Sequence, residues 1–148
     1  MARRPDPKHK TPAEVLADVR SGYADAMGYG PTEAQRYLEK TLGAQHSLPN
    51  AVKFFAYDLL AEVSYTNGDT AGCLQAVEAA RQYLAAAQDD APRELAAYLP
   101  EARFLERGIA VHADNNEIEQ ALALCDSAIE LGLGRVYDAK RRSLERRL

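Results

Sequence analysis

Residues 54–86, FFAYDLLAEVSYTNGDTAGCLQAVEAARQYLAA, decide the fold expected for this chain. Apolar residues recur at helical spacing on both sides of the turn Asn67-Gly68-Asp69, which predicts two amphipathic helices joined by a tight connection. Small residues, among them Ala61, Cys73 and Ala80, stand where the two helices would have to touch. The stretch therefore predicts an antiparallel helical hairpin.

The helix before this turn is apolar on two adjacent faces. One stripe contains Val52, Phe55, Ala56, Leu59, Leu60 and Val63, and the other contains Phe54, Tyr57 and Ala61. Because each apolar face must be buried against another element, we expect neighbours on two sides of this helix. It is therefore predicted to be an inner helix of a stack.

Capping and breaking signals divide the rest of the chain. Thr11 with Glu14 predicts a capping box, as does the stretch 114–117. Pro100 must split the segment 92–113, because proline lacks a donor and clashes with the preceding turn. We expect about seven helices and no strand, an all-α fold of antiparallel hairpins. The predicted helices include 31–45, 92–98, 100–113 and 135–148. Two more are predicted to begin near Pro12 and near Ile118, and two flank the turn at residues 67–69.

The composition is that of one helical globular domain. The chain has 148 residues, is rich in the helix formers Ala and Leu, and contains no Trp. No run approaches the roughly 18 apolar residues of a membrane span. The basic start is not followed by an apolar run, and Cys73 and Cys125 fall on predicted apolar faces. We therefore expect a cytoplasmic protein with reduced thiols, and its Ala-, Arg- and Asp-rich composition is typical of a GC-rich bacterium.

The net charge of −4 is unevenly distributed. Residues 1–10 carry +3 and residues 135–148 carry +4, so the residues between them carry −11. An acidic body repels phosphates, which disfavours nucleic acid as a partner, although the basic ends keep that alternative open. The predicted organisation is a disordered basic arm at 1–10, a helical domain at 11–134 and a basic capping helix at 135–148.

The central hairpin resembles a tetratricopeptide repeat. In that family the first helix carries a large aromatic residue, then Leu and a small residue. A turn rich in Gly and Asp follows, and the second helix carries two small residues seven apart with a bulky one between. The matching residues here are, in order, Tyr57, Leu60, Ala61, Gly68, Asp69, Cys73, Val77 and Ala80. Weaker echoes surround the central unit at 105–128 and at 22–34. The resemblance implies hairpins stacked as a short right-handed superhelix.

Two features depart from the family pattern. Equivalent small residues lie 39 positions apart from Ala34 to Cys73 and 48 apart from Cys73 to Ala121, against about 34 in the family. Ile109 stands where a small residue is expected, and Gly108 precedes it. A compact, non-repeating helical bundle therefore remains an alternative architecture.

The resemblance implies that a ligand binds on a concave face formed by the first helix of each hairpin. The candidate partner-binding residues on this face are Tyr23, Phe55, Asp58, Glu62, Tyr65, Thr66, Arg103 and Glu106, with Asp114 as a further candidate. Aromatic rings beside carboxylates would suit a peptide with a basic or apolar anchor. Phe55 has a second interpretation as core, because it belongs to the apolar stripe of its helix.

The basic C-terminal helix also has two interpretations. Its cations are Arg135, Lys140, Arg141, Arg142, Arg146 and Arg147. They could bind phosphate or an acidic partner, or they could form the polar outer face that a capping helix needs. The capping interpretation is favoured, because the positive charge can pair with the acidic body.

No residue pattern indicates catalysis, a metal or a cofactor. His9, His46 and His112 belong to unrelated elements, and the chain lacks HExxH, CxxC, a Walker loop and GxSxG. The sequence thus predicts a non-enzymatic adaptor that binds a peptide or a partner helix. The exposed ends of a short stack could also pair two copies as a homodimer.

Overall fold

The computed structural model describes residues 11–44 and 48–148, and within these ranges it contains helices and turns but no strand. The expected all-α fold is confirmed. The helices are α1 (Pro12–Met27), α2 (Pro31–Ala44), α3 (Asn50–Thr66), α4 (Thr70–Asp90), α5 (Pro92–Tyr98), α6 (Phe104–Asp114), α7 (Ile118–Glu130) and α8 (Val136–Glu145), with a 3-10 turn at Leu99–Glu101. The basic arm at 1–10 and the expected helix end at Gln45 lie outside the described residues.

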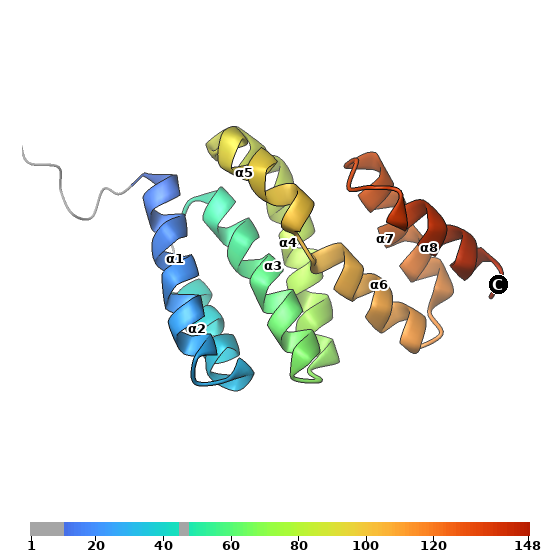
Figure 1. Ribbon diagram of the computed structural model, residues 1–148, viewed down its shortest axis with the longest axis horizontal. Coiled ribbons are helices and arrows are strands. Elements are labelled where there is room, and N and C mark those ends of the chain that lie inside the picture. Colours follow the sequence, from blue (N-terminus) through green and yellow to red (C-terminus); the bar gives the residue numbers. More distant parts are fainter. Residues whose placement is uncertain (1–10, 45–47) are drawn as a thin grey trace, which may run out of the picture.

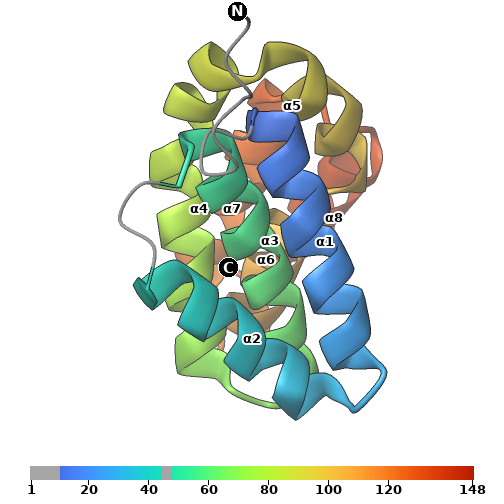
Figure 2. The ribbon, with the colours of Figure 1, turned by 90° about the vertical axis from the view of Figure 1, so that its left-hand side faces the viewer.

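Helices that follow one another in sequence pack side by side. Figure 1 shows α1 in front of α2, α3 in front of α4 and α8 in front of α7, with the pairs succeeding one another along the long axis. Contacts between successive pairs join α3 to α1 and α2, and α6 to α3 and α4. Figure 2, turned by 90°, shows α1 and α2 packed in front of the helices that follow them.

The turns that end α3 and α6 share one hydrogen-bonding scheme. At the end of α3, the N–H of Asp69 donates to the carbonyl of Ser64 at 2.8 Å, and the N–H of Gly68 donates to the carbonyl of Tyr65 at 3.1 Å. Gly68 has φ +75°, a conformation in which a Cβ would be strained. This is a Schellman motif, and the same pattern closes α6, where Asn116 takes φ +59°.

One of the two expected capping boxes is present. The side chain of Thr11 accepts from the N–H of Glu14, and the carboxylate of Glu14 accepts from the N–H of Thr11. The box expected at 114–117 is wrong, because Asp114 is the last residue of α6 and no side chain caps α7. The Schellman turn after α6 takes up these residues instead.

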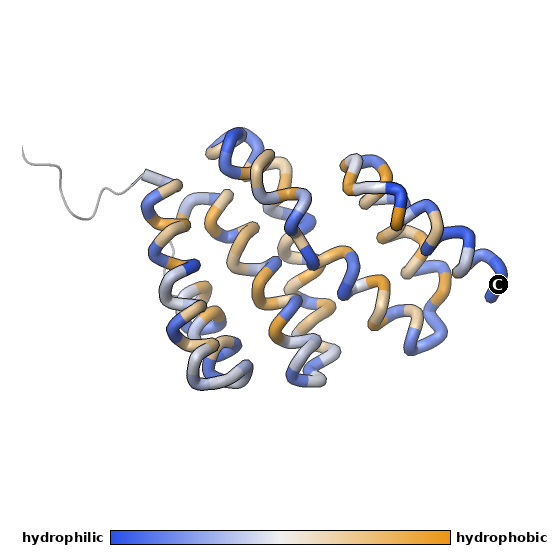
Figure 3. Tube along the Cα trace, viewed as in Figure 1, coloured by the Kyte–Doolittle hydropathy of each residue, from blue (hydrophilic) through white to orange (hydrophobic). Residues whose placement is uncertain are grey.

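Helix α3 lies in the middle of the core. Its buried residues are Ala51, Val52, Phe54, Phe55, Ala56, Asp58, Ala61, Val63 and Ser64, so the predicted inner helix is confirmed. Figure 3 shows hydrophobic segments along α3, whereas α8 is largely hydrophilic. Among the described helices, none is long and apolar enough to cross a membrane.

Pro100 splits the segment as expected, but the second helix begins later than predicted. Pro100 lies within the 3-10 turn, Ala102 is extended, and α6 starts at Phe104 rather than at 100. Gly108 then allows α6 to approach its neighbours closely. A Cβ on this glycine would lie 2.7 Å from a methyl of Leu124 and 3.1 Å from one of Val77. The small residue of this helix is therefore Gly108, and Ile109 packs in the core.

Candidate functional site

Helices α1, α3, α5, α6 and α8 form the side of the molecule nearest the viewer in Figure 1, which we call the front face. The residues predicted for a concave face all lie on three of these helices or at their ends. Packing of α3 against both α1 and α6 brings these three helices together. The predicted residues nevertheless differ sharply in exposure and in partners.

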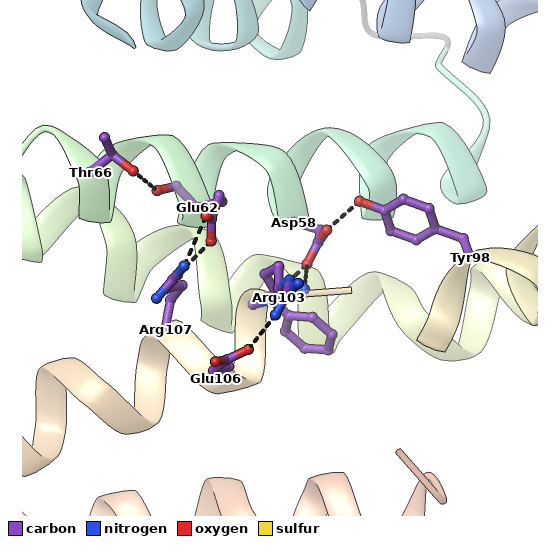
Figure 4. Close-up of polar contacts among 8 residues, drawn as sticks. Asp58, Glu62, Thr66, Tyr98, Arg103, Glu106 and Arg107 are labelled. Carbon is purple, nitrogen blue, oxygen red and sulfur yellow. Dashed lines mark hydrogen bonds and ion pairs between the residues drawn. The ribbon is translucent and has the colours of Figure 1, made fainter. Parts of the chain in front are cut away.

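Asp58 is buried, and the expectation that it points outward is wrong. Its Oδ1 accepts hydrogen bonds from the backbone N–H groups of Arg103 at 2.8 Å and Phe104 at 2.7 Å. Its Oδ2 accepts from the hydroxyl of Tyr98 (Figure 4). Since no local side chain caps α6, the carboxylate of Asp58 satisfies the donors that open this helix.

Burial shifts the titration of this cluster. It raises the pKa of Asp58 above the ordinary value, and the hydrogen bonds from Tyr98 and from the start of α6 only partly oppose that rise. Burial and the neighbouring carboxylate of Asp58 also raise the pKa of Tyr98, so its phenol keeps its proton and donates. The cluster is a structural junction between α3, α5 and α6.

Phe55 belongs to the core, which confirms the second of its two interpretations. Only 1% of its surface is exposed, and its ring centroid lies 3.7 Å from that of Tyr98. Phe54 packs edge-on against Phe55 and against Phe104, with centroids 6.3 Å and 5.4 Å apart. The side chain of Phe55 is therefore committed to the aromatic core and offers almost no surface to a partner.

Glu62 is held by a residue that the sequence did not single out. Arg107 Nε and Nη2 lie 2.5 Å and 3.0 Å from the two carboxylate oxygens of Glu62, a bidentate pair between α3 and α6 (Figure 4). The guanidinium also lies over the ring of Tyr65, with Cζ 4.8 Å from the centroid. All three side chains are partly exposed. Arg107 comes four residues after the predicted residue Arg103 and therefore lies on the same side of the helix, which is the signal in the sequence that could have identified it.

The other predicted residues lie on α1, at the end of α3 and along α6. Tyr23 lies on α1, which packs against α3, and its side chain is half-buried. Burial, followed by the negative charges of Glu62 and Asp58, raises its pKa. Arg103 pairs with Glu106 at 2.9 Å on the surface of α6. Thr66 is exposed, but its hydroxyl donates to the carbonyl of Glu62. Asp114 is exposed at the end of α6.

Two hollows open onto the front face. One of ≈ 280 Å³ lies between α6 and α8, with Ile109, Ala110 and Leu144 on its apolar wall and Lys140 at its edge. The other, of ≈ 390 Å³, lies between α1, α3 and α5. The face therefore combines ion pairs with two hollows that have apolar residues among their lining.

The basic residues of the C-terminal segment are partly engaged by the protein itself. Arg141 Nε lies 2.7 Å from Asp126, and the same guanidinium contacts Glu145. Arg147 donates to the carbonyl of Ala113 at 3.0 Å. The other cations, Arg135, Lys140, Arg142 and Arg146, lie on or beside α8. Two of the six cations thus hold the last helix against α6 and α7, as a capping role requires.

Neither thiol is placed for chemistry. Cys73 and Cys125 are both free and buried, and burial raises the pKa of Cys73 to about 11. Within residues 11–44 and 48–148, no cluster of three His, Cys, Asp or Glu side chains could hold a metal ion. His9 and His46 lie outside these ranges.

No protein-family model matches the chain, and neither a curated protein nor a solved structure shows significant similarity to it. The resemblance to the tetratricopeptide repeat therefore remains a prediction from the residues.

Proposed function

We propose that this protein is a non-enzymatic interaction module that binds a peptide or a helix of a partner protein on its front face. The observation that supports the proposal most is the assembly of this face from successive hairpins. Glu62 of α3 forms an ion pair with Arg107 of α6, and α3 also packs against α1, the helix that carries Tyr23. We infer that the hairpins are stacked as a short right-handed superhelix of the tetratricopeptide type, with the front face concave.

The chemistry of the face suits a peptide with an apolar anchor and charges of both signs. The ion pairs Glu62–Arg107 and Arg103–Glu106 offer each sign of charge at fixed places. The hollow between α6 and α8 offers an apolar seat beside them. Apolar anchors supply most of the affinity of such complexes, while rim charges set orientation and partner choice.

A pull-down from lysate of the source organism, followed by quantitative binding to the captured partner, tests this proposal. The test variant is the double change Arg103→Ala with Glu106→Ala on α6. The matched control is Glu78→Ala with Arg81→Ala on α4, which removes an ion pair of the same i,i+3 spacing away from the front face. The proposal expects binding to weaken about tenfold in the test variant and to remain unchanged in the control.

The alternative function is nucleic-acid binding by the basic termini. Repeating the pull-down with nuclease and with added salt distinguishes it from the adaptor. A protein partner that survives nuclease treatment supports the adaptor. Material lost on nuclease treatment, or lost when residues 135–148 are deleted while the α6 variant still binds, would overturn it. Arg141 and Arg147 are already engaged within the protein, which favours the capping role of α8 over phosphate binding.

A further inference from the structure

A further hollow lies away from the front face, between α2, α3 and α4, and it has a volume of ≈ 520 Å³. Tyr57, Leu60 and Ser64 line it from one stripe of α3, at spacings of three and four residues. Gly72, Ala76 and Ala79 line it from α4. The small residues of α4 leave the space that larger side chains would fill, so the volume suffices for a small ligand.

Ser64 provides the observation that points to a ligand. The residue has no exposed surface, and its hydroxyl is buried with no hydrogen-bond partner. A buried hydroxyl without a partner costs about 1–3 kcal/mol, and a folded protein tends to satisfy such groups. Because Ser64 belongs to the stripe of α3 that lines the hollow, a molecule in the hollow is the natural partner for this hydroxyl.

The charges around the hollow are of one sign. Glu39 on α2 and Asp69 at the start of α4 both line it, together with the amide side chains of Gln35 and Gln75. No Lys or Arg stands among the described residues that line it. Asp69 accepts from Gln35 at 2.8 Å and from the N–H of Gly72 at 2.9 Å, so its carboxylate is held in place. The wall is therefore rich in acceptors and attracts a cation.

An aromatic pair extends the same preference. Tyr57 stacks on Tyr83, with ring centroids 5.8 Å apart and planes at 7°. The ammonium of Lys53 already lies 5.1 Å from the centroid of Tyr83. The ring of Tyr83 is thus already taken by a cation, and Tyr57 is the member of the pair that lines the hollow, to which it adds aromatic surface.

We propose that the hollow between α2, α3 and α4 binds a small aliphatic amine, whose ammonium group donates to Ser64 and to the carboxylate of Glu39. The apolar stem of such an amine would lie against Leu60, Ala76 and Ala79. An ammonium has three donors and no acceptor, which matches a wall of carboxylate, amide and hydroxyl oxygens. This site is independent of the front face and of the function proposed for it.

Calorimetric titration with putrescine, a four-carbon diamine, at fixed ionic strength tests the proposal. We expect saturable binding at one site. The Ser64→Ala and Glu39→Gln variants should each bind about tenfold more weakly, since the first removes an acceptor for the ammonium group and the second removes the negative charge that strengthens its hydrogen bond. Ser64→Ala should fold at least as stably as the parent, because it removes a hydroxyl that has no partner.

Glu33→Gln is the matched control, because Glu33 is an exposed glutamate of the same helix that does not line the hollow. Its affinity for putrescine should equal that of the parent. Absence of saturable binding would overturn the proposal, as would an unchanged affinity in Ser64→Ala. An equal loss in Glu33→Gln and Glu39→Gln would also overturn it, because general attraction by an acidic surface would then explain the binding.

Discussion

The carboxylate of Asp58 caps a helix that begins 46 residues later in the chain, with Oδ1 2.7 Å from the backbone nitrogen of Phe104. This contact fixes the start of α6 against the middle of α3. It thereby sets the register of α6 against α3. Arg107, three residues after Phe104, meets Glu62, which is four residues after Asp58. The geometry of the front face therefore depends on a carboxylate that lies beneath it.

Replacing Asp58 separates the role of its hydrogen bonds from that of its charge. Asp58→Ala leaves two backbone donors and the Tyr98 hydroxyl buried without an acceptor, so we expect a loss of about 3 kcal/mol or more in the free energy of unfolding. In Asp58→Asn, the amide oxygen can still accept from both backbone groups and the amide nitrogen can donate to Tyr98. Urea unfolding should therefore show a much smaller loss, and equal losses in the two variants would contradict this account.

The same pair predicts a pH dependence with a definite sign. Because burial raises the pKa of Asp58 above 3.8, the folded state binds a proton more readily than the unfolded state. This proton contributes its full stabilisation at pH values below the pKa of Asp58 in the unfolded state. The stabilisation is lost as the pH rises through the pKa of Asp58 in the folded state. The difference in unfolding free energy between the parent and Asp58→Asn should therefore fall as pH rises above about 3.8. A difference that grows over that window would show that the pKa is lowered instead.

Two glycines within helices should respond to alanine in opposite directions. At Gly108, an added methyl would press against Leu124 and the β-branched Val77, so Gly108→Ala should destabilise the protein by about 1–3 kcal/mol. At Gly43 in α2, nothing lies within 4 Å of the added Cβ, and Gly43→Ala should stabilise by about 0.5–1 kcal/mol. Thermal unfolding of the two variants compares them directly. A stabilising Gly108→Ala would show that α6 can move away from α7.

The buried thiols should be inert in the folded protein. With the pKa of Cys73 at about 11, about one molecule in a thousand carries its thiolate at pH 8, and burial also blocks access. Burial likewise raises the pKa of Cys125. Ellman's reagent should therefore label neither thiol at pH 8 until denaturant is added, when two thiols per chain should react. Fast labelling of the folded protein would show that α4 or α7 opens locally.

Most local features of the fold could be predicted, because they rest on residues a few positions apart. The cap at Thr11 and Glu14, the turn at 67–69 and the break at Pro100 are each set by backbone geometry and short-range hydrogen bonds. The start of α6 was missed, because its capping carboxylate comes from another helix. The box at 114–117 was wrong, since a Schellman turn competes for the same residues.

The sequence by itself determined the helical class and the inner position of α3, because periodicity records which faces are apolar. Only the tertiary structure decided which polar residues of that helix reach the surface. Asp58 and Glu62 are both carboxylates one turn apart, yet the first is buried and the second is half-exposed. The difference arises because Tyr98 and the start of α6 cover Asp58, whereas the carboxylate of Glu62 pairs with the partly exposed side chain of Arg107. Those partners lie 40 or more residues away, beyond the reach of any local pattern.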